Sequence, residues 1–278
     1  MRSLSLVLVV LGILAACNVS SDGNYSEKTA PLQVAKRYVA DVTIALSHTD
    51  LSPQWANAEV KSSSEDPSAY AVLVPLGSHS GTYLHVDVFR GKARGALLIG
   101  YDATRTRAEI FNLDLHTVAI ITNLQTDNRA VNRVDRQSLR ILQPVVQAIS
   151  AADVAPLNPG ISALISDTRE ENTVSILCSA VDAPMYDALL AATDNLNAAV
   201  DRMYDALDAY EAAAAAMWST CSACAAGYAT MCGPCVGLTA AYFAAQRAFY
   251  NAVDTVDYWS DRVRYYQEQV GDWVAANC

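Results

Sequence analysis

The sequence predicts an α+β N-terminal domain, built from a helix and an antiparallel β-meander, followed by an all-α antiparallel coiled-coil hairpin with disulfides. Three observations lead to this fold class. Apolar residues alternate with polar ones between residues 69 and 121, they recur at heptad spacing from residue 184 onward, and six cysteines lie in or beside the heptad region. Alternation is typical of half-buried strands, and a sustained heptad repeat is typical of paired helices.

The N-terminus has the features of an export signal. Arg2 precedes an apolar run that ends at Ala16 and is too short to span a bilayer comfortably. The run closes with Leu14-Ala15-Ala16-Cys17, which resembles the lipobox of bacterial lipoproteins. The resemblance implies that residues 1–16 are a cleaved signal peptide, that Cys17 carries the lipid, and that residues 17–30 are a tether. The alternative is an ordinary secretory signal with a chance cysteine.

The same resemblance implies a location in the cell envelope. The lipid would hold the protein on a membrane, facing the periplasm or the exterior. Asn18 follows the cysteine, where an aspartate would resemble an inner-membrane retention signal. The outer membrane is therefore favoured if the source is Gram-negative.

Charge and composition suggest two domains. The formal net charge is −10, which argues against nucleic acid as a partner because such proteins need basic patches. From Cys178 onward there are 12 Asp and Glu against four Arg and no Lys, so the acidic character lies in the C-terminal part. We expect an α+β domain over 31–152, a Pro-, Gly- and Ser-containing linker over 153–177, and the hairpin over 178–278.

Within the first domain, residues 31–46 have helical spacing with Pro31 in the first turn. Alternation then predicts strands over 69–75, 82–89, 95–102, 107–113 and 116–121, and a second helix over 131–152 that Pro144 kinks or ends. The predicted arrangement of one helix against an antiparallel meander is similar to that of cystatin-like or PepSY-like domains. This similarity implies no function.

Two heptad rows run through each arm of the predicted hairpin. The first arm has one row from Tyr186 to Cys221 and another from Leu189 to Cys224, while the second arm has rows from Cys235 to Val270 and from Cys232 to Val274. A short turn separates the arms. In an antiparallel pair the numbers of facing residues have a constant sum. One sum, 456, pairs Cys221 with Cys235, Cys224 with Cys232 and Cys178 with Cys278.

The tetrapeptide Cys232-Gly-Pro-Cys235 leaves two other interpretations open. It is the redox motif of thioredoxin-like enzymes, but no strand precedes it. Two Cys-x-x-Cys pairs can also bind zinc, although the gap between them is short. Export favours oxidation, so we expect three disulfides, no metal and no cofactor.

Residues 221–232, Cys-x-x-Cys-x7-Cys, also resemble the start of the cysteine-rich peptide in halocin-type bacteriocin precursors. That resemblance implies an immunity-like N-terminal domain and a C-terminal peptide that is cut free in the linker. The sequence departs from the family in its long heptads, its six hairpin cysteines, its lipobox and its negative charge.

The other polar motifs predict no catalytic or metal site. The loop at 77–81 has His79 where a nucleophile elbow has serine. His85 and Asp87 share one strand face and are expected to be a surface pair, and Glu109 and Asp114 have no defined partner.

Acidic residues also recur every seven positions along each arm. They form a solvated outer face or a docking surface for a basic partner, and they are Asp187, Asp194, Asp201, Asp208, Asp254, Asp261 and Glu268.

These observations predict a non-enzymatic cell-envelope lipoprotein whose acidic helical hairpin binds another protein. The membrane is reached through the N-terminal lipid, and the protein partner is an envelope protein, a basic one if the acidic residues form the docking surface. The alternative is the bacteriocin-like precursor, and a thiol-disulfide oxidoreductase is the third interpretation.

Overall fold

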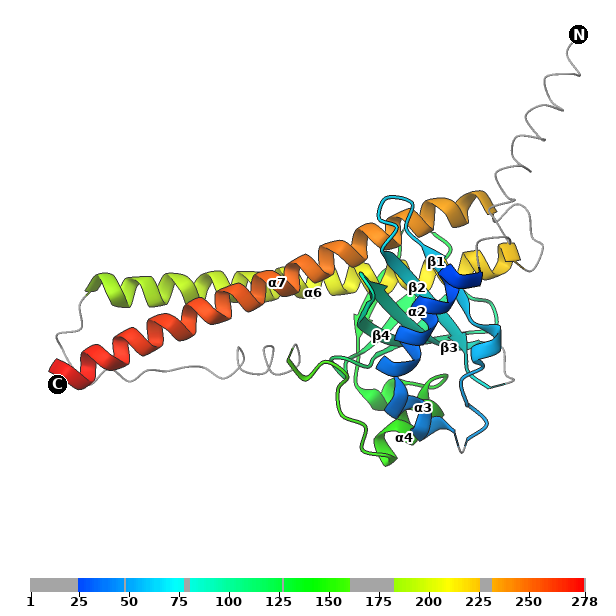
Figure 1. The fold of residues 1–278 in the computed structure, drawn as a ribbon, viewed down its shortest axis with the longest axis horizontal. Helices are drawn as coiled ribbons and strands as arrows, with labels where there is room; N and C mark the ends of the chain where they lie inside the picture. Colours follow the sequence, from blue (N-terminus) through cyan, green and yellow to red (C-terminus); the bar gives the residue numbers. More distant parts are fainter. Residues whose placement is uncertain are drawn as a thin grey trace, which may run out of the picture. The chain divides into compact units, whose positions relative to one another are not determined.

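The computed structural model describes residues 25–47, 49–77, 81–126, 128–160, 183–225 and 232–277. Within them lie an antiparallel sheet, three short helices and two long C-terminal helices (Figure 1). The predicted signal peptide, Cys17, Cys178, Cys278, His79 and most of the 153–177 linker lie outside the described residues. None of the described helices is both long and apolar enough to cross a bilayer.

The sheet is an antiparallel meander of seven strands in chain order. The five predicted strands are present as β2 Ala69–Pro75, β3 Thr82–Phe89, β4 Lys92–Tyr101, β5 Arg107–Asn112 and β6 Val118–Thr122. Two short edge strands, β1 Glu59–Ser62 and β7 Ala130–Arg133, complete the order β1-β2-β3-β4-β5-β6-β7. Consecutive strands pair throughout, so the sheet is held by local connections.

The first predicted helix begins earlier than expected and is interrupted. Helix α2 spans Tyr25–Tyr38, so it starts inside the segment predicted to be a tether, and Pro31 lies within it instead of in its first turn. Val39 has φ −101° and ψ 26°, which lies outside the α-helical region. Helix α3, Ala40–Leu46, follows this break.

The prediction of a second helix over residues 131–152 is wrong for the first half of that range. Ala130–Arg133 pairs with β6 as strand β7, and a single 3-10 turn follows at Arg136–Ser138. Helix α4 spans only Gln143–Ala151. Pro144 lies in its first turn, where the missing N–H has no intrahelical partner to lose, so this proline starts the helix instead of kinking it.

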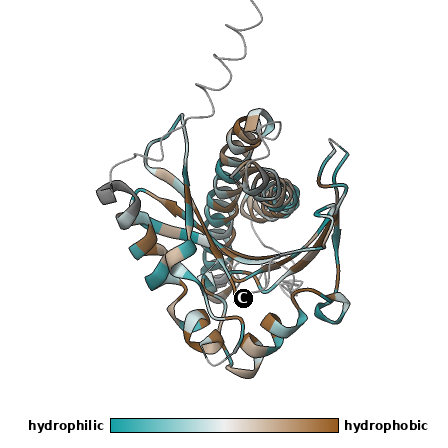
Figure 2. Ribbon diagram, turned by 90° about the vertical axis from the view of Figure 1, so that its right-hand side faces the viewer, coloured by the Kyte–Doolittle hydropathy of each residue, from teal (hydrophilic) through white to brown (hydrophobic). Residues whose placement is uncertain are grey.

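Both faces of the sheet are buried. One face packs against α2, α3 and α4, and the main core there includes Val72, Val74, Leu84, Val86, Val88, Ala96, Leu98 and Phe111. The strand residues that point the other way are also buried, and they include Ala71, Leu73, His85, Asp87, Leu97, Ile99 and Tyr101. Parts of the two long helices cover this second face, while the short helices lie on the outer side of the curved sheet (Figure 2).

The long helices are α6, Ala183–Ala225, and α7, Cys232–Asn277. They are shared between two compact units. The first contains the sheet, the short helices and residues Ala212–Phe243, and the second contains residues Asn158–Glu211 and Ala244–Cys278. We call the described parts of Ala212–Phe243 the tip. The sequence placed all of 178–278 in one domain, whereas the tip belongs to the compact unit of the sheet.

In the second unit the heptad rows face inward. The buried residues of α6 include Leu189, Leu196, Met203, Leu207 and Tyr210, and those of α7 include Phe249, Val253, Val256, Val263 and Val270. The rings of Tyr210 and Phe249 stack with centroids 5.4 Å apart. The two helices therefore pack together along the rows that the heptad pattern predicts.

Candidate functional site

Four polar side chains meet where the tip lies on the sheet, and we call them the tip cluster. His85 and Asp87 come from β3, Trp218 from α6 and Tyr242 from α7. All four are 0% exposed. Buried polar groups need partners, because an unpaired one keeps the full cost of losing water.

The hydrogen bonds of the cluster assign the tautomer of His85. Trp218 Nε1–H donates to His85 Nδ1 at 3.0 Å. Since an indole nitrogen only donates, Nδ1 accepts and the ring proton of neutral His85 lies on Nε2. That nitrogen donates to Asp87 Oδ1 at 2.9 Å. The Tyr242 hydroxyl donates to the same oxygen and lies 3.1 Å from His85 Nε2.

The expectation of a surface pair at His85 and Asp87 is wrong. Alternation along β3 shows correctly that the two share a face, but the tip covers that face and excludes water. A His–Asp pair can support general-base catalysis when a substrate reaches the ring. Here both ring nitrogens already bind groups of the protein, so the geometry fits attachment of the tip to the sheet.

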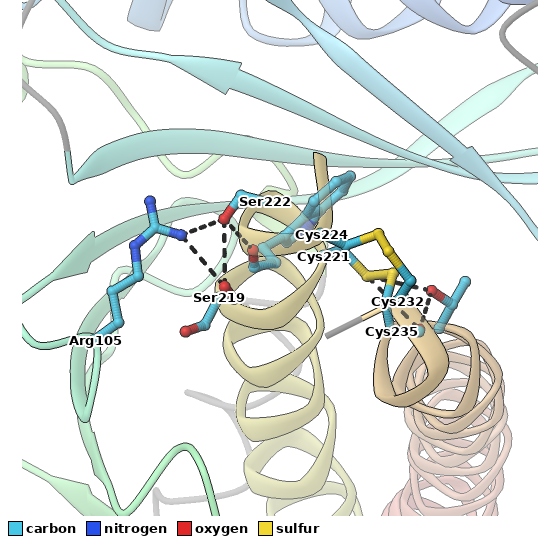
Figure 3. The surroundings of a disulfide bond; sticks show 9 residues. Arg105, Ser219, Cys221, Ser222, Cys224, Cys232 and Cys235 are labelled. Carbon is cyan, nitrogen blue, oxygen red and sulfur yellow. Dashed lines mark hydrogen bonds between the residues drawn. A yellow bond between two sulfur atoms is a disulfide. The ribbon is translucent and has the colours of Figure 1, made fainter. Parts of the chain in front are cut away.

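Further polar contacts flank the tip cluster. The Tyr101 hydroxyl donates to the Ala215 carbonyl at 2.7 Å, and burial raises the pKa of Tyr101, which keeps this donor protonated. Arg105 donates to the Ser219 carbonyl at 3.3 Å and to the Ser222 hydroxyl (Figure 3). Strand β4 and the loop after it therefore hold successive turns of α6.

Two disulfides join the helices within the tip. Cys221 pairs with Cys235 and Cys224 with Cys232, with Cα atoms 4.9 Å apart in each pair. These are two of the three pairs of the predicted register, and the third lies outside the described residues. The Cys-Gly-Pro-Cys motif is thus not bridged internally, since each of its cysteines binds one from α6.

A second buried carboxylate, Glu109, holds the chain before α4. Its oxygens accept the backbone N–H groups of Arg140, Ile141 and Leu142 at 2.8–3.1 Å, and Arg107 donates to it at 3.2 Å. Gly100, paired with Glu109 across the sheet, allows this approach, because a Cβ there would lie 2.8 Å from Ile141. Glu109 therefore has defined partners, contrary to expectation.

Asp114 also has partners. The Tyr38 hydroxyl of α2 donates to one of its oxygens, and the Ala96 N–H donates to the other at 2.7 Å. Burial raises the pKa of Asp114 to about 7, although both hydrogen bonds act in the opposite direction.

The raised pKa of Asp114 predicts a specific pH dependence of stability. The folded chain binds this proton up to about pH 7, whereas the unfolded carboxyl releases it near its ordinary pKa of 3.8. The contribution to stability is therefore complete below pH 4 and is lost as the pH rises through 7. At about 1.4 kcal/mol per pKa unit, the loss is at most about 4 kcal/mol.

Urea unfolding of the wild type and of Asp114→Asn at several pH values measures this effect. The asparagine can still accept from Ala96 and pair with Tyr38 but does not titrate. Between pH 4 and 7 the wild type should lose stability relative to Asp114→Asn, while exposed Asp41→Asn should follow the wild type. Parallel curves for wild type and Asp114→Asn would contradict the prediction.

The predicted acidic docking residues lie mostly on the surface. Asp187, Asp194 and Asp201 are exposed on α6, and Asp254, Asp261 and Glu268 are exposed on α7. We call these six residues the acidic rows. Asp208 is half-buried and is not part of them.

The sequence analysis missed Trp218 and Tyr242 as partners of His85. One signal could have revealed the contact. Residues 211–219, "EAAAAAMWS", have no polar face, and a helix that is apolar all round is buried on more than one side. The heptad rows account for only one of those sides.

Comparison of the chain with protein-family models, curated proteins and solved structures found no match.

Proposed function

We propose that this protein is a cell-envelope lipoprotein that acts by binding another protein through the acidic rows, and not by catalysis. In this proposal, α6 and α7 form an antiparallel coiled-coil hairpin, Cys178–Cys278 closes its open end, and Cys17 carries the lipid. The observation that carries the proposal is the exposure of six carboxylates at heptad spacing, on helices whose opposite sides are buried.

The row on α7 also contains exposed aromatic rings. Tyr258 is 56% exposed and Tyr265 is 50% exposed. They alternate with Asp254, Asp261 and Glu268 at spacings of four and three, which places all five on one side of the helix. Carboxylates pair with Lys and Arg head groups, and aromatic faces attract cations and cover aliphatic stems. This surface suits a basic protein partner.

The tip cluster weighs against the bacteriocin-like alternative. Release of 178–278 as a peptide would separate Trp218 and Tyr242 from the sheet and expose His85 and Asp87 to water. Removing partners from buried polar groups costs about 1–3 kcal/mol each, so the tip behaves as a part of the folded domain.

The disulfides weigh against the oxidoreductase interpretation. A thioredoxin-like site needs its two cysteines to bond reversibly with each other near solvent. Here Cys235 is 8% exposed and bonds to the almost fully buried Cys221. Interhelical pairing of this kind suits a structural staple.

In vivo cross-linking of the full chain tests the proposal. We expect one protein to cross-link specifically, and neutralising the acidic rows with five Asp→Asn changes and Glu268→Gln to abolish the product. A control that neutralises the exposed Asp41, Asp50 and Asp135 of the other unit should retain it. Because ion pairs at exposed sites are screened by salt, high salt should also weaken binding.

A Cys17→Ser chain separates the anchor from the docking surface. It should leave the membrane fraction but still bind the purified partner, since stable anchoring takes acyl chains that serine does not receive. Retention on membranes after a high-salt wash would disprove the anchor. Undiminished cross-linking by the neutralised rows would disprove the docking surface.

A further inference from the structure

The four cysteines of the tip come from only two helical turns. Cys221 and Cys224 are three residues apart on α6, and Cys232 and Cys235 are three apart on α7. Residues at this spacing lie on one side of a helix, with Cβ atoms about 5–6 Å apart. Across the helices each Cα–Cα separation is 4.9 Å. The four side chains therefore lie close together between the facing sides of α6 and α7.

This arrangement matches a tetrahedral thiolate site once the disulfides are reduced. Structural zinc binds four cysteine thiolates at about 2.3 Å, commonly as two Cys-x-x-Cys pairs. In the disulfide-bonded structure no group of three or more His, Cys, Asp or Glu among the described residues could hold a metal ion. The sulfurs become ligands only as thiolates, so the site exists in the reduced protein alone.

One polar neighbour also suits such a centre. The Thr239 hydroxyl donates to the Cys235 carbonyl at 2.8 Å and also lies 3.7 Å from Cys221 Sγ. In the reduced form its proton can turn to a thiolate instead, as outer hydrogen bonds do around metal ligands.

The two disulfides differ in how far they are exposed to solvent. Cys224 and Cys232 are half-buried, whereas Cys221 and Cys235 are buried. A reductant or a metal ion therefore meets the Cys224–Cys232 pair first. The tip cluster involves no cysteine, so its hydrogen bonds can hold the tip on the sheet after both disulfides open.

We propose that the reduced tip is a zinc site whose ligands are Cys221, Cys224, Cys232 and Cys235, so that reduction of the two disulfides converts the tip from a stapled form into a zinc form. Two dithiol molecules each reduce one disulfide by thiol–disulfide exchange and leave as disulfides. The four thiols then release four protons and bind one Zn²⁺. This inference does not depend on the proposed lipoprotein function.

Metal titration of the reduced full chain tests the proposal. The protein is reduced with excess dithiothreitol without oxygen, desalted, and titrated with Co²⁺ and then with Zn²⁺. We expect one Co²⁺ per chain with the intense visible bands of tetrahedral cobalt thiolate, and stoichiometric displacement of cobalt by one Zn²⁺. The oxidised chain should bind neither metal.

Two matched variants assign the ligands. A chain with Cys17→Ser, Cys178→Ser and Cys278→Ser keeps only the four tip cysteines and should bind as the wild type does. A chain with Cys224→Ser and Cys232→Ser keeps the Cys221–Cys235 disulfide for folding, and after reduction it should give no tetrahedral thiolate spectrum. Absence of uptake by the first variant, or an unchanged spectrum in the second, would overturn the proposal.

Discussion

Trp218→Ala should lower the free energy of unfolding by about 3–5 kcal/mol, the range for removing a large aromatic side chain from a core. Trp218 is the largest of the fully buried side chains. Its loss leaves a cavity and removes the hydrogen-bond donor of His85 Nδ1. Urea unfolding of the full chain measures the change. Hydrogen exchange should show faster exchange across the tip than in β4.

Two comparisons separate packing from hydrogen bonding at this position. Trp218→Phe keeps a buried ring but removes the indole donor, so it should cost about 1–3 kcal/mol, the penalty for an unsatisfied buried group. Tyr258→Ala, at a 56% exposed position, should stay within about 0.5 kcal/mol of the wild type. A cost for Trp218→Ala no larger than that for Tyr258→Ala would show that the tip does not pack on the sheet.

Glu109→Ala should be comparably damaging, at about 3–5 kcal/mol in total, because a buried donor left without its acceptor costs about 1–3 kcal/mol. The substitution leaves three consecutive N–H groups, those of Arg140, Ile141 and Leu142, without their acceptor. Thermal and urea unfolding report the loss. Proteolysis should cut first near residues 134–142, because that segment loses its attachment to the sheet.

Arg107→Ala is the matched control for Glu109. The Arg107 side chain is 34% exposed, so its ion pair with Glu109 is partly screened and its removal should cost below about 1 kcal/mol. If Arg107→Ala were as harmful as Glu109→Ala, the ion pair would be the source of stability, and the role assigned to the backbone groups would be wrong.

The central strands and two disulfides could be predicted from the sequence because each depends on a regular spacing. Alternation locates β2 to β6, and a constant sum pairs the tip cysteines. The edge strands β1 and β7, "EVKS" and "AVNR", have four residues each and contain no fully buried residue, so they carry no alternation to detect. The position of helix α4 relative to Pro144 could not be predicted, because a proline marks a helix boundary without showing on which side the helix lies.

The tip cluster could not be predicted in the same way. Alternation shows that His85 and Asp87 share a face, but nothing local to β3 shows what covers that face. The covering residues, Trp218 and Tyr242, lie 133 and 157 positions along the chain from His85. The pairing follows from the shape of the assembled sheet, which a periodic pattern does not encode.

Because β3 and the helices that cover it lie far apart in the sequence, the sheet can form before its covering layer does. Each strand of the meander pairs with its sequence neighbour, so the sheet can form from short loops, whose closure costs little entropy. The face that holds His85 and Asp87 then stays open until more than a hundred further residues have been made. During that interval it presents Leu73, Leu97 and Ile99 to solvent, a surface prone to aggregation. The nascent chain therefore needs its own C-terminal helices as the last covering layer.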